Sequence, residues 1–142
     1  DMAPMKFTKS ILNKKPIDIY NNGNLSRDFT YIDDIIQGIY KCCFKPATII
    51  KNKMSYSMAP YRIFNIGNGN PIKLLEFINL LEKKLDVKAL RNYLPMQQGD
   101  VFETFANTEN LRNWINNKPN TNIDEGLEKF VEWYKKYYGC NS

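Results

Sequence analysis

The chain has 142 residues, of which 43% are apolar and 13% aromatic; this is enough to bury a core and argues against disorder. Its formal net charge is +5, but the lysines are scattered among acidic residues, which favours a solvated surface over a nucleic-acid footprint. No apolar run approaches the ~18 residues of a membrane span. We therefore expect neither nucleic acid nor a membrane as a partner.

The chain contains no histidine and three cysteines. Without histidine it lacks the commonest general base, a principal zinc ligand and every Ser-His or Cys-His nucleophile pair, so we expect no metal site. Cys42 and Cys43 are adjacent and Cys140 is the odd one left over, a poor disulfide framework. With no signal segment, this pattern predicts reduced thiols in a cytoplasmic compartment.

The first predicted element is a helix that carries Phe7 and Ile11 on one side. Pro4 fits near its first turn, because the N–H that proline lacks would be unpaired there. The chain begins with Asp1 rather than methionine and with a helix already under way, so we expect a fragment. A short alternating strand at 17–20 and an Asn-rich turn at 21–24 that tolerates positive φ follow.

An amphipathic helix is predicted after residue 31. Its apolar stripe recurs at positions i, i+3, i+4, i+7 and i+11, which are Ile32, Ile35, Ile36, Ile39 and Cys43. Thr30 and Asp33 resemble a capping box. The β-branched and aromatic residues at 29–31 predict a strand that leads into this helix.

Arg27 immediately precedes this predicted strand and helix. A long charged side chain on a rigid element holds an anion better than one on a free loop, so we expect Arg27 to contact a ligand. The alternative is a surface ion pair with Asp28 or Asp33, which would contribute little.

The second half of the chain alternates strands and helices. In order, we expect a surface loop (46–60), a strand (61–66), a helix (71–85), a strand (88–95), a polar loop (96–100), a short helix capped by Asn107 and a last helix (122–138) ended by Gly139. Asn70 would cap the helix at 71–85, with Pro71 in its first position. This alternation predicts an α/β fold with a small sheet and flanking helices, a lobe that packs on something larger.

The stretch from Gly67 to Ile72 follows a predicted strand and precedes a helix, the setting of a dinucleotide-binding turn. However, Ile72 occupies the third glycine position. Asp86 lies at the spacing of a ribose-binding acid but ends the same helix. A tight strand-to-helix turn is therefore the better interpretation.

Three stretches together resemble one family: RDFTYIDDI at 27–35, YRIFNIGN at 61–68 and LPMQQGDV at 94–101. Their order and spacing are similar to the C-terminal half of extended short-chain dehydrogenase/reductase nucleotide-sugar enzymes. The UDP-glucuronate 4-epimerases, often described as capsular polysaccharide biosynthesis proteins, are most similar. The resemblance covers 1–142. It implies the C-terminal lobe of an NAD-dependent epimerase/dehydratase, a single, incomplete domain lacking the N-terminal Rossmann half.

In this family the N-terminal half binds NAD and carries a catalytic Tyr-x-x-x-Lys pair. None of the nine tyrosines here has a lysine four residues later. The resemblance therefore implies no catalytic or cofactor-binding residue in this chain, with NAD bound by the missing half. Two alternatives follow: the NAD-binding half is separately encoded, or this chain is a degraded remnant. The parent family is often homodimeric.

The resemblance also implies substrate contacts. Arg27 would contact the diphosphate of a UDP-sugar, Asp100 would hydrogen-bond the uridine ribose, and Tyr20 would line the uracil. Gln97 stands where galactose-type epimerases have an arginine, so one phosphate charge contact is lost. Lys6 would lie near the sugar carboxylate.

We therefore expect the UDP-sugar-binding portion of an NAD-dependent UDP-sugar 4-epimerase of the UDP-glucuronate type, serving polysaccharide precursor synthesis. The alternative is a non-catalytic remnant or a protein-interaction module without enzymatic activity.

Overall fold

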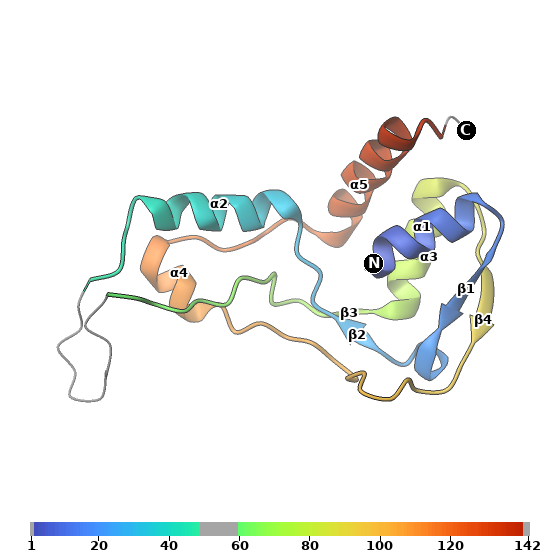
Figure 1. Ribbon diagram of the computed structural model, residues 1–142, viewed down its shortest axis with the longest axis horizontal. Helices are drawn as coiled ribbons and strands as arrows, with labels where there is room; N and C mark the ends of the chain where they lie inside the picture. Colours follow the sequence, from blue (N-terminus) through green and yellow to red (C-terminus); the bar gives the residue numbers. More distant parts are fainter. Residues whose placement is uncertain (1, 49–59, 141–142) are drawn as a thin grey trace.

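The computed structural model describes residues 2–48 and 60–140, so most of the predicted surface loop at 46–60 lies outside the described residues (Figure 1). The helices are α1 (Ala3–Leu12), α2 (Ile32–Cys43), α3 (Leu74–Leu85), α4 (Glu109–Ile115) and α5 (Ile123–Tyr138). The strands are β1 (Pro16–Ile19), β2 (Ser26–Arg27), β3 (Ile72–Lys73) and β4 (Leu90–Tyr93), with a 3₁₀ turn at Tyr20–Gly23. The predicted α/β class is confirmed.

The strands form two small sheets. β1 pairs in parallel with β4, so that Ile17 lies opposite Arg91. β2 pairs antiparallel with β3, and Arg27 lies opposite Ile72. The predicted strands at 17–20 and 88–95 are confirmed as β1 and β4. The predicted turn at 21–24 is confirmed too, with two asparagines at positive φ.

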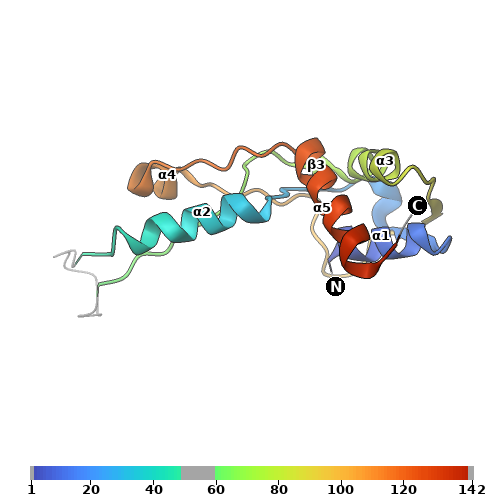
Figure 2. The same ribbon diagram turned by 90° about the horizontal axis from the view of Figure 1, so that it is seen from above.

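The core lies at one end of the molecule, where α1, α3 and α5 gather around β1 and β4 (Figures 1 and 2). Its most deeply buried apolar side chains come from α1, β1 and α3: Ile11, Ile17, Ile19, Phe77, Ile78 and Leu81. On α3 these residues recur at helical spacing, so one stripe faces the core. Helices α2 and α4 extend away toward the other end. Among the residues described, no helix has the length and apolar character needed to cross a bilayer.

Helix α2 forms as predicted, but most of its isoleucine stripe faces solvent, with only Ile35 half-buried. Ile32 is 58% exposed, Ile36 54% and Ile39 49%. The helix instead packs through Gly38, which lies against Ile66 and Leu111. A stripe of this kind normally faces a core, and no described part of the chain covers these three side chains.

Two strand predictions are wrong. β2 ends at Arg27, and 28–31 is irregular. The segment 61–66 is assigned no strand and has no ladder partner among the described residues. Its Tyr-Arg-Ile-Phe-Asn-Ile sequence suits a strand, but a strand forms only where a second strand accepts its hydrogen bonds.

Two helix starts also differ from prediction. Tyr31 is the N-cap of α2 with no side-chain cap bond, because the Thr30 hydroxyl accepts instead from the Asn68 N–H at 3.1 Å. Asn70 does not cap α3, whose N-cap is Lys73. Ile72 and Lys73 form the short strand β3 instead, so the helix begins only at Leu74.

The ends of the last two helices follow the sequence more closely. Thr108, not Asn107, is the N-cap of α4, although the Asn107 side chain accepts from the Glu109 N–H at 3.0 Å. Asn122 is the N-cap of α5, at the predicted start of this helix, and its side chain accepts from the Glu125 N–H at 2.9 Å. Gly139 ends α5 at a φ of 63°, also as predicted.

Candidate functional site

A cleft of about 950 Å³ lies between α1, the β1–β2 region and the loop that follows β4. All five residues predicted to bind substrate line it. Lys6 comes from α1, Tyr20 follows β1, and Arg27 is on β2. Gln97 and Asp100 come from the loop after β4. The fold therefore brings the predicted set together, and their roles as ligand contacts remain predictions.

The Arg27 side chain is held by several acceptors. Its Nη2 atom lies 2.5 Å from Asp100 Oδ1, and its Nη1 atom donates to the Ser26 carbonyl at 2.8 Å and to the Phe102 carbonyl at 3.4 Å. The Arg27 side chain is 25% exposed. The alternative of an ion pair with Asp28 or Asp33 is wrong, because the carboxylate partner of Arg27 among the described residues is Asp100.

Asp100 sits at the end of a tight turn. The Asp100 N–H donates to the Gln97 carbonyl at 3.2 Å, and Gly99 between them has a φ of 84°, where a side chain would be strained. The Val101 N–H donates to Asp100 Oδ1 at 2.9 Å. The side chain of Asp100 is 30% exposed, so it is oriented by the turn yet open to the cleft.

The remaining predicted residues differ in exposure. Tyr20 is half-buried and packs against the core cluster, which suits the wall of a pocket for a ring. Lys6 and Gln97 are exposed at the rim. Lys9 and Asp18 also line the cleft and were not singled out from the sequence, because neither belongs to a recognisable motif.

The cleft carries cations and carboxylates together, which suits a ligand with both an anionic part and hydroxyl groups. Across 2–48 and 60–140 no group of three or more His, Cys, Asp or Glu residues could hold a metal ion.

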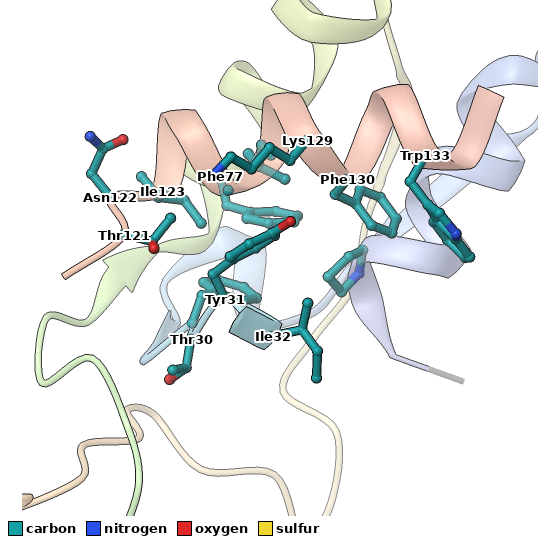
Figure 3. Close-up of a pocket in the computed structure, with 14 residues that line it drawn as sticks. Thr30, Tyr31, Ile32, Phe77, Thr121, Asn122, Ile123, Lys129, Phe130 and Trp133 are labelled. Atoms are coloured by element: carbon teal, nitrogen blue, oxygen red, sulfur yellow. The ribbon is translucent and has the colours of Figure 1, made fainter. Parts of the chain in front are cut away.

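A second, apolar groove of about 450 Å³ lies between α1, α5 and the start of α2 (Figure 3). Figure 3 shows Tyr31, Phe130 and Trp133 along it. The Lys129 ammonium lies 5.1 Å from the centre of the Tyr31 ring. None of the predicted substrate-binding residues lines this groove. Sequence analysis missed it, since its aromatic residues occur at ordinary core spacing.

Solved structures identify the fold. A UDP-glucuronic acid 4-epimerase from Bacillus cereus, in complex with UDP-glucuronic acid and NAD, matches with a TM-score of 0.79 and 28% identity. The match covers 97% of this chain and 41% of that one. The fold is thus that of a lobe of an NAD-dependent nucleotide-sugar epimerase.

Sequence relatives agree. Protein CapI of Staphylococcus aureus is 47% identical over 97% of this chain and 43% of its own length. UDP-glucuronate 4-epimerase 1 of Arabidopsis thaliana is 46% identical over the whole chain and 34% of its own length. The model of the NAD dependent epimerase/dehydratase family matches residues 3–67. Over nearly its whole length the chain is similar to a C-terminal portion of these epimerases, and it spans less than half the length of these relatives.

Proposed function

We propose that this chain is the substrate-binding portion of an NAD-dependent UDP-sugar 4-epimerase of the UDP-glucuronate type, acting in polysaccharide precursor synthesis. One observation carries the proposal: Arg27 and Asp100, 73 residues apart in sequence, meet in one cleft. The relatives named UDP-glucuronate 4-epimerase and CapI support the choice of sugar and pathway.

Each cleft residue has a proposed role. The Arg27 guanidinium presents a fork of charged donors to the diphosphate, and the Asp100 carboxylate accepts hydrogen bonds from the ribose. Tyr20 lines the uracil, Gln97 lies beside the phosphates without a charge, and Lys6 lies near the sugar carboxylate. Binding is then an exchange, in which Arg27 leaves the carboxylate for phosphate and Asp100 leaves the guanidinium for hydroxyl groups.

NAD would accept and return the hydride at C4 of the sugar, and we assign its binding to a polypeptide segment outside this chain. The turn at 67–70 does not fit a pyrophosphate, because three of its backbone donors are already used. The Asn68 N–H bonds Thr30, and the Gly69 and Asn70 N–H groups bond Asp28. No Tyr-x-x-x-Lys pair exists in the 142 residues to relay a proton.

The proposed partner is the N-terminal, NAD-binding half, whether in the same polypeptide or separately encoded. The exposed isoleucines of α2 and the segment 61–66, which pairs with no strand among the described residues, give it a surface. An apolar helix face and a free strand edge are both features that a neighbouring sheet would satisfy. We therefore propose one incomplete domain that does not catalyse epimerisation by itself, in a reducing, cytoplasmic compartment that suits its free cysteines.

The same exposed face favours the second candidate, a protein-interaction module without substrate binding. Calorimetry separates the two. UDP and UDP-glucuronate are titrated into the full chain, into Arg27→Ala, and into Arg112→Ala, a control that removes an exposed arginine from α4. We expect binding that Arg27→Ala weakens about tenfold or more while Arg112→Ala leaves it unchanged. If UDP fails to bind even with an NAD-binding half from a relative present, the interaction module is favoured.

A further inference from the structure

The carboxylate of Asp28, the residue after Arg27, is occupied entirely by backbone donors in the described contacts. Its two oxygens lie 3.1 and 3.0 Å from the Gly69 nitrogen. Oδ1 also accepts from Asn70 at 3.4 Å, and Oδ2 accepts from Ala106 at 3.2 Å. These donors lie on two segments that are remote from Asp28 in sequence, so one side chain fastens both to β2.

The turn at 67–70 is shaped for this carboxylate. A Cβ atom on Gly67 would overlap Ala106 Cβ and would lie 3.0 Å from Asp28 Oδ2. Gly69 has a φ of 71°, a conformation that presents successive N–H groups to one point. Such backbone nests bind anions in many proteins. Here the anion is the chain's own carboxylate, which explains why the turn resembles a dinucleotide-binding sequence.

The segment 102–106 runs beside β2, held by a short ladder. The Ser26 N–H donates to the Phe102 carbonyl at 2.9 Å, and the Thr104 N–H donates to the Ser26 carbonyl at 3.3 Å. The Asp28 N–H then donates to the Thr104 hydroxyl at 3.0 Å. The bond from Ala106 to the Asp28 carboxylate closes this ladder at the far end from the loop that carries Asp100.

We propose that Asp28 is a positioning residue that fixes the register of 102–106 against β2 and so holds Asp100 within reach of Arg27. The effect of this positioning on ligand binding rests on the proposed function. Because the negative charge of Asp28 is used by N–H groups, it does not compete for the neighbouring guanidinium. Arg27 therefore pairs with Asp100 in the free chain, and it binds the phosphates when a nucleoside diphosphate enters the cleft.

The main test variant is Asp28→Asn in the full 142-residue chain. The amide has the size of the carboxylate, but it turns an NH₂ group toward backbone N–H donors. Asp33→Asn is the matched control, because it removes the same charge from an exposed position in the first turn of α2. Thr104→Val and Thr104→Ser form a second pair on an exposed residue, the first removing the acceptor of the Asp28 N–H and the second keeping it.

The first readout is NMR of the Arg27 guanidinium without ligand. An ion-paired guanidinium rotates slowly and gives separate Nη signals, so we expect these signals to merge in Asp28→Asn and Thr104→Val and to persist in both controls. The second readout is the ratio of UDP to uridine affinity, which reports the diphosphate contact. We expect that ratio to fall about tenfold in Asp28→Asn, and the effects of Asp28→Asn and Arg27→Ala to be less than additive.

A general loss of stability would weaken UDP and uridine alike, so it would leave the ratio unchanged. The positioning role would be overturned if the Arg27 Nη signals stayed separate in a folded Asp28→Asn variant. If Asp28→Asn does not fold, separate signals in Thr104→Val would overturn it in the same way. If the unmodified chain binds no UDP, the proposed function is overturned. If the Arg27 signals nevertheless respond to Asp28→Asn, the positioning of Arg27 and Asp100 is still supported.

Discussion

The guanidinium of Arg27 and the carboxylate of Asp100 bond each other at 2.5 Å across the cleft. Each group satisfies the other, and each is still about a quarter to a third exposed, at 25% and 30%. A uridine diphosphate can replace both halves of this interaction at once, since it offers phosphate oxygens to one group and ribose hydroxyls to the other. The proposed affinity for this ligand should therefore depend on the two residues in separable ways.

Asp100→Ala should remove recognition of the ribose. The unmodified chain is expected to bind UDP more tightly than 2′-deoxy-UDP, because a carboxylate that accepts a hydroxyl hydrogen bond contributes about 1.5–3 kcal/mol. Asp100→Ala should bind the two nucleotides equally. Calorimetric titrations with both give the ratio, and Glu132→Gln on the exposed face of α5 is the charge control. A variant that still discriminates would show that the ribose lies elsewhere.

Arg27→Lys should bind UDP more weakly than the unmodified chain and more tightly than Arg27→Ala. Lysine keeps the positive charge but presents a single ammonium in place of a planar fork, and it cannot also reach the carbonyls that now hold the guanidinium. UDP affinities of the three proteins at one ionic strength give the order. Equal affinities for Arg27→Lys and the unmodified chain would mean that only charge matters.

Glu82 on α3 predicts a pH-dependent stability. It is 3% exposed and accepts from Lys88 at 2.8 Å and from Arg91 at 2.8 Å. Burial by itself would raise the pKa of Glu82, but these bonds and one from the Ala89 N–H outweigh it and hold the pKa below its ordinary 4.5. Because the unfolded state binds the proton more readily, this stability is present above pH 4.5 and is lost as the pH falls through the lower pKa of the folded state.

Glu82→Gln should lower the free energy of unfolding at pH 7 by about 1.5–3 kcal/mol, because the buried carboxylate that accepts charged hydrogen bonds from Arg91 and Lys88 is lost. Its stability should also fall less steeply than that of the unmodified chain below the ordinary pKa. Urea denaturation between pH 7 and pH 3 measures both effects. Glu76→Gln, on the exposed side of α3, should match the unmodified chain within about 0.5 kcal/mol. If the stability of Glu82→Gln fell with decreasing pH as steeply as that of the unmodified chain, Glu82 would not be the source of the pH dependence.

Ile36→Lys tests the exposed face of α2. The side chain is 54% exposed, so we expect stability within about 0.5 kcal/mol of the unmodified chain. Apolar patches left open promote association, so sedimentation should show less self-association for Ile36→Lys than for the control Gln37→Lys. Complementation by an NAD-binding half should weaken in the same order. Equal behaviour of the two variants would show that this face has no partner.

The sequence predicted well the features that depend on neighbouring residues. The final helix is an example, because its apolar spacing and its stop at Gly139 depend on residues within a few positions of one another. The predicted strand at 61–66 does not form, because the preference of its residues for an extended backbone cannot supply a second strand to pair with. The exposure of the α2 stripe was missed for the same reason, since burial depends on what lies across from the helix.

The cleft itself was anticipated through the family resemblance, not through any pattern in the residues. Nothing local marks Asp100 as the partner of Arg27, and a surface pair with Asp28 looked as reasonable. The role of Asp28 was missed because its donors, at Gly69 and Ala106, come from segments that only the folded chain brings together.

The most direct measurement is a titration of UDP into the isotopically labelled full chain, followed by NMR at every assigned amide. We predict saturable shifts concentrated at Arg27 and in the turn at 97–100, with new guanidinium signals for Arg27 as it moves from carboxylate to phosphate. Shifts confined to the apolar groove of Figure 3, or no saturable shift in the cleft with an NAD-binding half present, would contradict the account.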